Sequence, residues 1–286
     1  SGRALTSQPQ RGIPMKLIDG KAISASVRED IKAQIDELAA AGIKPGLAVI
    51  IVGDNPASRV YVNNKKKACE YVGFKSLEYA LPADTTQDEL MALVDELNNR
   101  ADVNGILCQL PLPKHLDEKA VIEAIPYKKD VDAFHPINVG HIMIGDFTFL
   151  PCTPAGIMEM LKYYNISVSG KKCVVIGRSN IVGKPMAMLM LHANATVTVC
   201  HSRTKDLASI VKEADIVIIQ VVTPHRATIL RKVKDRNPQM KGLISVTETD
   251  VAPDLKTAYV YVSIYGVTEE KAKRSFDILQ ENAGFF

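Results

Sequence analysis

Hydrophobic and polar residues follow two alternating patterns from Met15 onward, and together they predict an α/β protein. Apolar positions at helical spacing predict helices, and short uninterrupted apolar runs predict buried strands. In the first half, the predicted elements are helix 25–41, strand 47–52, helix 57–72, strand 76–81, helix 86–99 and strand 105–109. Strands separated by helices of this length form a parallel sheet with both faces covered. Residues 145–151 are expected to form a turn and a crossing segment.

A second run of alternating elements starts near Thr153-Pro154, where Pro154 suits the first turn of a helix. The predicted elements are helix 155–164, strand 172–176, helix 183–192, strand 196–200, helix 208–213 and strand 216–221. This order is one β-α-β-α-β half of a dinucleotide-binding fold. We therefore expect two domains, the first at residues 15–150 and a Rossmann-like half at residues 151–222.

The pattern changes after residue 222. The predicted elements there are a basic helix at 227–236, two β-rich runs at 243–251 and 257–265, and a final helix at 269–282. The two runs are joined by five residues and must be antiparallel, because a parallel return needs a crossover of a dozen residues or more. We expect residues 243–249 to extend the second sheet beside strand 216–221, which otherwise has an unpaired side. Residues 257–265 would then form the edge, with the last helix over one face.

Composition restricts the class of protein without changing this fold. The 286 residues include 35 Lys and Arg against 32 Asp and Glu, and the net charge of +3 gives no electrostatic case for a nucleic-acid binder. No apolar stretch reaches the roughly 18 residues of a transmembrane helix. The five cysteines have no CxxC spacing and four lie in or beside apolar stretches, which favours a reducing cytoplasm over a disulfide framework or zinc site. Residues 1–14 are interpreted as a leader or tail outside the fold.

A glycine-containing loop between a predicted strand and a predicted helix is the strongest chemical signal. It reads GRSNIVGKP at residues 177–185, with the spacing GxSxxxG. In this position, glycines let the backbone approach a pyrophosphate and the helix N-terminus supplies amide donors; the alternative is a plain tight turn. The next strand ends in residues 201–204 without an acid for a ribose 2′-hydroxyl. Arg178, Ser202 and Arg203 therefore favour the 2′-phosphate of NADP.

Tyr61 and Lys65 are candidates for catalysis, because they are four residues apart and share one face of a predicted helix. A lysine desolvated beside an aromatic ring can act as a general base or proton donor. The alternative is a solvated basic stretch, since Lys66 and Lys67 follow directly.

Two further polar segments lie at or after the last strand of the first half. Gln109 ends this strand, and its side chain either points to the crevice where parallel sheets bind ligands or has a structural role. Residues 129–136 offer Asp130, Asp132 and His135, but the Asp-x-Asp spacing alone is a poor indication of a metal site, and no metal ligand is assigned.

Six motifs occur together and in order along the chain. They are SRVYVNNK at 58–65, GILCQLPLP at 105–113, KDVD at 129–132, PCTP at 151–154, GRSNIVGKP at 177–185 and CHSRT at 200–204. Together they resemble the bifunctional methylenetetrahydrofolate dehydrogenase/cyclohydrolase family over roughly residues 15–222. The resemblance implies oxidation of 5,10-methylenetetrahydrofolate with NADP, followed by hydrolysis of the methenyl product to 10-formyltetrahydrofolate.

The resemblance also implies roles for individual residues. Lys65 matches the central catalytic residue and Gln109 the residue that tunes it, while Tyr61 matches the residue that stacks on the folate. Asp132 matches the residue that anchors the pterin, and it is assigned to the catalytic set as well. The residues assigned to NADP are Thr153, Gly177, Arg178, Ser179, Ile181, Gly183, Ser202 and Arg203. An extended aromatic folate suits a cleft between two domains, and the family implies a homodimer.

The last quarter of the chain departs from this family. The family's further βα unit and its Pro-Gly-Gly-Val-Gly-Pro-Met-Thr loop are absent, and residues 224–286 resemble bacterial ribosome-binding factor A instead. The ending at 282–285 looks like the helix-kink motif of that family's KH-like RNA-binding domain. Both parents are cut inside a domain, so we interpret the chain as a chimera, more in keeping with an engineered than a natural one. Its α-β-β-α segment, residues 223–286, would complete the second domain.

Three functions remain as alternatives at this point. The first is the folate dehydrogenase and cyclohydrolase activity, by descent. The second is ribosomal RNA binding through the C-terminal segment, whose ten Lys and Arg against eight Asp and Glu form a weak basic footprint. The third is a chimera in which activity is impaired or absent. Because the missing loop closes over folate and nicotinamide in the family, we expect the dehydrogenase activity to suffer more than the cyclohydrolase activity.

Overall fold

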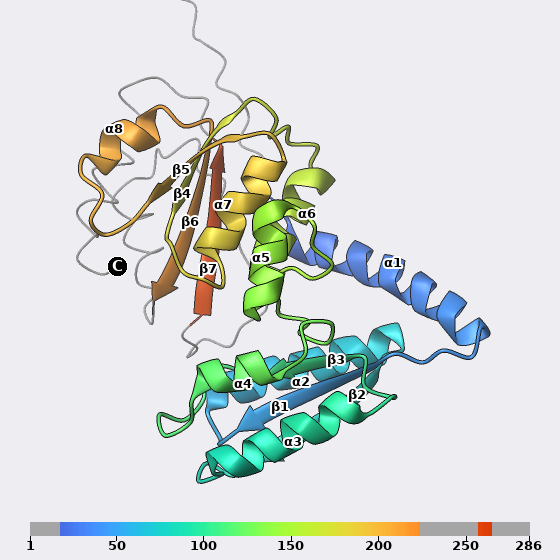
Figure 1. The fold of residues 1–286 in the computed structure, drawn as a ribbon. Coiled ribbons are helices and arrows are strands. Elements are labelled where there is room, and N and C mark those ends of the chain that lie inside the picture. The colour runs from blue at the N-terminus through green and yellow to red at the C-terminus, as the bar shows by residue number, and fades with distance from the viewer. Residues whose placement is uncertain (1–17, 224–256, 265–286) are drawn as a thin grey trace, which may run out of the picture.

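The computed structural model of the chain describes residues 18–223 and 257–264. These residues form two α/β units, each built on its own sheet (Figure 1). The first sheet has the strand order β2-β1-β3, and the second has the order β5-β4-β6-β7. None of the described helices is long and apolar enough to cross a membrane.

The first unit confirms the predicted alternation of helices and strands. Its elements are α1 (Gly20–Ala40), β1 (Gly46–Val52), α2 (Pro56–Val72), β2 (Lys75–Leu81), α3 (Gln87–Asn99) and β3 (Gly105–Cys108). β1 is central and pairs in parallel with both neighbours. One face of β1 packs against Leu90 and Val94 of α3, and the other packs against Val62 of α2. The parallel sheet is therefore covered on both faces, as the apolar runs predicted.

Two short helices were not predicted from the pattern, α4 (Glu118–Ala124) and α5 (Pro136–Ile144). Helix α4 has seven residues and is started by Asp117, whose side chain accepts a hydrogen bond from the N–H of Ala120 at 3.1 Å. Helix α5 begins at a proline after the His135 cap and ends at Gly145 in the left-handed region, with φ of 84°. Its sequence PINVGHIMI is apolar on nearly every side, so it has no helical period to recognise.

The second unit confirms the predicted half of a dinucleotide-binding fold. Its elements are α6 (Cys152–Tyr163), β4 (Lys172–Ile176), α7 (Gly183–His192), β5 (Thr196–Cys200), α8 (Leu207–Lys212) and β6 (Ile216–Thr223). β4 pairs in parallel with β5 and with β6. Met186 and Met190 of α7 are fully buried against one face of the sheet, and Val211 of α8 packs on the other. The glycine loop therefore lies between a central strand and a buried helix.

The prediction that residues 243–249 pair with strand 216–221 is wrong. β7 (Thr257–Ile264) itself pairs with β6 in antiparallel register, from Ile216 opposite Ile264 to Thr223 opposite Thr257. The sequence of β7 is rich in β-branched and aromatic residues, and its eight residues pair with all eight of β6, so no strand fits between them. Residues 257–264 thus do contribute to the second sheet, and they occupy the place beside β6 that was expected for residues 243–249. Residues 243–249, with segments 227–236 and 269–282, fall outside the described part of the chain.

The cysteines are distributed as the apolar stretches predicted. Cys69, Cys108, Cys173 and Cys200 are buried, Cys152 is exposed, and all five are free. Burial raises the pKa of Cys108 and of Cys173 to about 12, so both thiols stay protonated near neutral pH. They act as small apolar side chains in the two cores.

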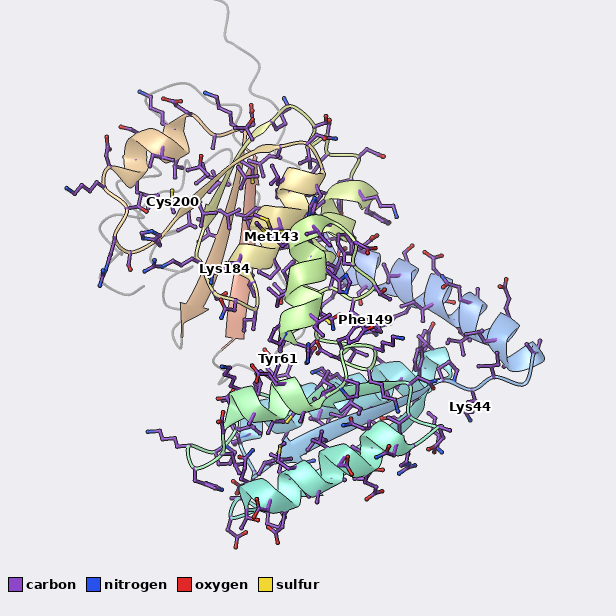
Figure 2. The ribbon with its side chains drawn as sticks, in the orientation of Figure 1. Lys44, Tyr61, Met143, Phe149, Lys184 and Cys200 are labelled. Carbon is purple, nitrogen blue, oxygen red and sulfur yellow. The ribbon has the colours of Figure 1, made fainter. Side chains whose placement is uncertain are left out.

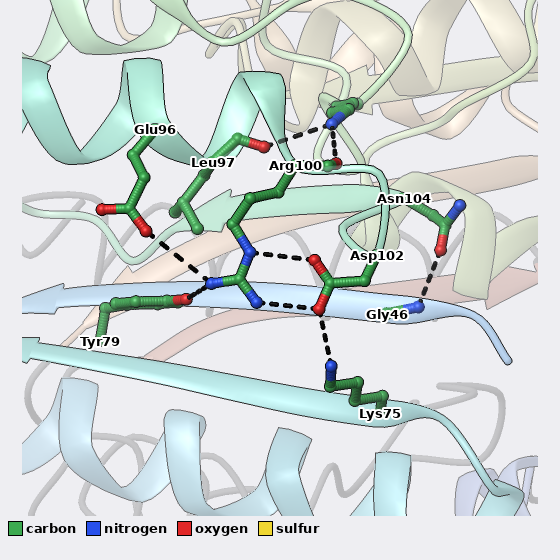
Figure 3. Close-up of polar contacts among 9 residues, drawn as sticks. Gly46, Lys75, Tyr79, Glu96, Leu97, Arg100, Asp102 and Asn104 are labelled. Carbon is green, nitrogen blue, oxygen red and sulfur yellow. Dashed lines mark hydrogen bonds and ion pairs between the residues drawn. The ribbon is translucent and has the colours of Figure 1, made fainter.

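A cluster of charges joins the amino ends of the strands in the first sheet (Figure 3). The Arg100 guanidinium donates from Nε and Nη2 to the two oxygens of Asp102, each at 2.9 Å. Lys75 Nζ at the start of β2 donates to the same carboxylate at 2.6 Å, and Arg100 Nη1 reaches the Tyr79 hydroxyl. These hydrogen bonds hold the pKa of Asp102 well below its usual range. The cluster ties β2 to the turn before β3.

Replacement of Asp102 should therefore weaken the first unit in a pH-dependent way. A carboxyl whose pKa is lower in the folded than in the unfolded chain stabilises the fold above the unfolded pKa, near 3.8 here, and loses this effect as the pH falls. We expect Asp102→Asn to lower the urea midpoint at pH 7, and the difference from wild type to shrink below about pH 4. The control is Glu96→Gln, because Glu96 lies 3.9 Å from the same guanidinium and is exposed. Equal midpoints for both variants at pH 7 would contradict the prediction.

Candidate active site

The predicted catalytic pair Lys65 and Gln109 is in direct contact. Gln109 follows β3, and its backbone N–H donates to the carbonyl oxygen of Ile50 at 2.8 Å, which fixes it at the carboxyl edge of the sheet. Its Nε2 donates to the carbonyl oxygen of Leu110 at 2.9 Å, so its Oε1 is turned toward α2. Lys65 Nζ donates to this Oε1, also at 2.9 Å. Gln109 thus orients the ammonium group.

Helix α2 presents Tyr61 and Lys65 on one face, as their spacing predicted. Both side chains are half-buried, whereas Lys66 and Lys67 are exposed. The interpretation as a solvated basic stretch therefore holds for the latter two and is wrong for Lys65. Figure 2 shows Tyr61 in the region between the first unit and helix α5, which leads into the second unit.

Asp132 lies near Lys65 in a poorly hydrated position. Burial raises the pKa of Asp132 to about 6, the positive charge of Lys65 opposes this rise, and the negative charge of Asp130 adds to it. Asp132 also contributes to the raised pKa of Cys108 at the end of β3 and of Cys152 at the start of α6. The three residues Lys65, Gln109 and Asp132 are therefore brought together from α2, β3 and the loop before α5.

The residue after Asp132 is in a strained backbone conformation. Ala133 has φ of 56° and is 1% exposed, and its N–H donates to the carbonyl oxygen of Asp130 at 3.2 Å. The left-handed region is unfavourable for residues that carry a Cβ. The tight turn that places the Asp132 side chain is therefore maintained by the surrounding structure at a local energetic cost.

The glycine loop of the second unit fits a close backbone approach. Gly177 has φ of 134°, and a Cβ added to Gly183 would lie 2.6 Å from the carbonyl carbon of Gly177 and 2.8 Å from the nitrogen of Arg178. The Ser179 hydroxyl accepts hydrogen bonds from the N–H groups of Val182 and Gly183, at 3.1 and 3.2 Å. Ser179 thus folds the loop over the start of α7 and takes up two amides that were expected to face a pyrophosphate.

The end of β5 carries basic and hydroxyl side chains and no acid. Ser202 and Arg203 are exposed there, and Arg178 is exposed at the end of β4. His201 N–H donates to the Thr204 hydroxyl at 2.8 Å, which shapes this turn. An exposed basic strand end fits the 2′-phosphate of NADP better than a free ribose hydroxyl. The two other residues assigned to the cofactor are the exposed Ile181 in the glycine loop and the half-buried Thr153 in the first turn of α6.

Sequence reasoning missed the residues that hold the Asp132 loop. Lys129 Nζ donates to the carbonyl oxygens at the end of α3, at 2.9 to 3.2 Å; these belong to Leu97, Asn98 and Arg100. Three acceptors at a helix C-terminus, the negative end of its dipole, suit an ammonium group. The motif KDVD was noted for its acids, but its lysine binds carbonyl groups about 30 residues earlier in the chain, and its first aspartate accepts hydrogen bonds from His135 and Asn138.

Two family models match the chain. The model for the catalytic domain of tetrahydrofolate dehydrogenase/cyclohydrolase matches residues 18–132, and the model for the NAD(P)-binding domain matches residues 151–233. The second match extends past residue 222, where the motifs placed the end of the resemblance.

Individual relatives agree with these matches. The bifunctional protein FolD of Agathobacter rectalis is 61% identical over 208 residues, 73% of this chain and 75% of the relative. That of Acetivibrio thermocellus is 58% identical over 209 residues, 73% of each chain. The crystal structure of FolD from Campylobacter jejuni has a TM-score of 0.71 and 51% identity, covering 73% of this chain and 75% of that one. A Trypanosoma brucei structure, complexed with NADP cofactor and inhibitor, has a TM-score of 0.69 and 37% identity over 73% of both chains.

Replacement of Ala133 by glycine should change the stability of the protein little. Glycine removes the steric conflict at positive φ, which is worth about 1–2 kcal/mol, but it also removes a buried methyl group and increases the entropy of the unfolded chain, so we expect the free energy of unfolding to stay within about 0.5 kcal/mol of wild type. The matched control is Ala92→Gly on the exposed side of α3, where the same substitution should cost about 1 kcal/mol. Urea titrations of both variants measure these changes. A loss in Ala133→Gly as large as that in Ala92→Gly would show that this loop is unstrained.

Replacement of Gly183 by alanine should remove dinucleotide binding. The new Cβ would meet backbone atoms of Gly177 and Arg178, which have no flexible end that can yield, so the loop must open. We expect calorimetry to show at least a tenfold loss of NADP affinity, with little change in the unfolding of the first unit. Gly156→Ala in α6 is the control, because nothing lies within 4 Å of its added Cβ. Unchanged affinity in Gly183→Ala would exclude this loop as the cofactor site.

Proposed function

The chain belongs to the tetrahydrofolate dehydrogenase/cyclohydrolase family, and on this premise we propose that it oxidises 5,10-methylenetetrahydrofolate with NADP and hydrolyses the methenyl product to 10-formyltetrahydrofolate. The observation that carries the proposal is the hydrogen bond of Lys65 to Gln109 beside Asp132. These groups lie at the carboxyl edge of a parallel sheet, where such sheets bind ligands.

In the hydrolytic step, we assign proton transfer to Lys65. The methenyl carbon is part of a cation, and a water molecule that attacks it must lose a proton as the carbon–oxygen bond forms. Gln109 is the one hydrogen-bond partner of Lys65 within the described part of the chain, so other N–H directions of Lys65 remain for the substrate or the water. The neutral Lys65 amine can accept this proton and, as the resulting ammonium, return it to the ring nitrogen that departs when the carbon–nitrogen bond breaks and the ring opens.

Asp132 and Tyr61 are assigned to folate binding. When ionised, Asp132 accepts hydrogen bonds from N–H donors such as those of a pterin, and its raised pKa makes this binding sensitive to pH near 6. Its negative charge also favours a cationic methenyl group nearby. Tyr61 offers a flat ring of suitable size for stacking on an aromatic substrate.

The second unit fits NADP by the chemistry of its loops. Gly177 and Gly183 allow the close backbone approach, while Arg178, Ser202 and Arg203 supply positive charge and donors for a 2′-phosphate. The chemistry that bound NADP supplies is acceptance of a hydride from the methylene carbon of the folate. The arrowhead of β6, whose direction β4 shares, points toward the first unit, so the glycine loop after β4 emerges on that side (Figure 1).

We also keep the C-terminal chimera as a proposal, with the chain divided into a leader at 1–14, a folate unit at 15–150, an NADP half at 151–222 and a segment at 223–286. Two observations support a change of parentage in this region. No family match extends beyond residue 233, eleven residues after the end that the motifs gave, and β7 is antiparallel in an otherwise parallel sheet. We propose that the remaining segment derives from a ribosome-binding-factor-like KH domain, and that the protein is a cytoplasmic homodimer. RNA binding is not favoured, because the segment is nearly balanced in charge.

The test is to measure both activities in one preparation, with Campylobacter jejuni FolD as the intact reference. Lys65, Gln109 and Asp132 are all present, so we expect methenyltetrahydrofolate hydrolysis that Lys65→Met abolishes. Hydride transfer needs closer alignment, and a misplacement of about 1 Å costs on the order of a hundredfold in rate. NADPH formation should therefore be reduced by up to this factor, while NADP still binds. Full dehydrogenase turnover, or loss of the hydrolase alone, would contradict the expected difference between the two activities. Absence of both activities would contradict the proposed function.

A further inference from the structure

A buried carboxylate next to Asp132 has no part in the roles assigned so far. Asp130 is 4% exposed, and its Oδ2 accepts hydrogen bonds from the backbone N–H of His135 and from Nδ2 of Asn138, both at 2.8 Å. Among the described residues, no Lys, Arg or His side chain forms an ion pair with it. A buried carboxylate without such donors is strongly unfavourable, so these two contacts determine where the surrounding chain can lie.

The contacts of Asp130 close the segment that carries Asp132 into a loop. The N–H of Ala133 donates to the carbonyl oxygen of Asp130, and the N–H of His135 returns to its carboxylate. The start of the loop is attached to β3, because Ile106 forms a parallel bridge with Asp130. Asp132 thus lies in the middle of a short segment that is fixed at both ends.

Asn138 connects this loop to helix α5. It is 5% exposed, and its Nδ2 donates to the Asp130 carboxylate and to the carbonyl oxygen of Tyr127, both at 2.8 Å. The far end of α5 is held by α7 of the second unit, where Nε2 of His192 donates to the carbonyl oxygen of Ile142 at 2.8 Å. Because α7 starts at the glycine loop, a continuous set of packed contacts leads from the Asp132 loop to the cofactor side.

We propose that Asp130 and Asn138 are positioning residues, which hold Asp132 toward Lys65 and seat α5 between the folate and cofactor sides. They touch neither the substrate nor the cofactor and act through Asp132. The catalytic consequence rests on the proposed function, whereas the effect on the surroundings of Asp132 follows from the geometry alone.

The electrostatic part of this role concerns every charged or titratable group that faces Asp132. These groups are Lys65 from α2, Asp130 from its own loop, Cys108 from β3 and Cys152 from α6. Lys65 lowers the pKa of Asp132, and the Asp130 carboxylate raises it. A substitution such as Asp130→Asn, which removes the charge and keeps the shape of the side chain, should therefore lower the pKa of Asp132.

The first experiment separates positioning from general stabilisation. Asn138→Ala should lower kcat/KM for methenyltetrahydrofolate hydrolysis by about 10- to 100-fold, because Asp132 is no longer held in place. Asn104→Ala is the matched control: Asn104 Oδ1 accepts a hydrogen bond from the backbone N–H of Gly46 at 2.9 Å, at the amino edge of the first sheet and therefore at the edge opposite to the candidate site. It should lower the melting temperature and leave kcat/KM within twofold. Equal kcat/KM values in the two variants would overturn the proposal.

The main readout of the second experiment needs neither substrate nor activity. Carbon-13 NMR titration of the Asp132 carboxyl should give a pKa that is lower in Asp130→Asn than in wild type by about one unit. The acid limb of the folate-binding profile should move to lower pH by the same amount. An unchanged Asp132 pKa would overturn the electrostatic role of Asp130. If the wild type does not bind folate, the proposed function fails, while this titration still decides between the two outcomes for Asp130.

Discussion

The common direction of parallel strands is the constraint on which the site depends. Strands that run the same way release all of their following loops at one edge of the sheet. Gln109 after β3, the glycine loop after β4 and the basic turn after β5 therefore emerge at carboxyl edges. The Arg100–Asp102 cluster lies at the opposite edge of the first sheet (Figure 3). The groups that stabilise the sheet are thus separated from the groups available to a substrate.

Because of this separation, ionised carboxylates have different environments at the two edges of the sheet. At the amino edge, Asp102 is paired with two cations, and its ionised form stabilises the fold. At the carboxyl edge, burial disfavours the ionised form of Asp132, and the turn that carries it includes Ala133 at positive φ. A poorly hydrated carboxylate is unfavourable for the isolated protein but can bind a polar ligand strongly, because little of its own hydration is lost on binding. The buried hydrogen bonds of Asp130 hold this loop in its unfavourable conformation.

The sequence predicted those features that depend on local pattern. Strands such as Gly46–Val52 have uninterrupted apolar runs, and Tyr61 and Lys65 share a face at any helix position. Features that depend on tertiary contacts could not be predicted from the local pattern. Helix α5 is apolar on nearly every side and is recognisable by its caps more than by a period. The partner of β6 was misplaced because pattern identifies strands but not their order in a sheet, and antiparallel pairing is compatible with any long connection. Nothing in the sequence distinguishes Asn138 from other polar residues, because its role depends on its two acceptors, the Asp130 carboxylate and the Tyr127 carbonyl oxygen.

In the glycine loop, several backbone amides that could bind an anion are engaged within the loop, so specificity for the cofactor depends more on side chains. At many helix N-termini the free amides bind an anion directly. Here the Ser179 hydroxyl accepts from the amides of Val182 and Gly183, and the Lys184 amide donates to the Ser179 carbonyl oxygen. With these amides engaged, the loop's contribution is close backbone approach more than charge. In the proposed cofactor site, the discrimination between NADP and NAD is therefore assigned mainly to Arg178, Ser202 and Arg203. Because Ser202 and Arg203 are exposed at the end of β5, outside the glycine loop, a change of cofactor preference at these two positions requires no change in the loop that folds over α7.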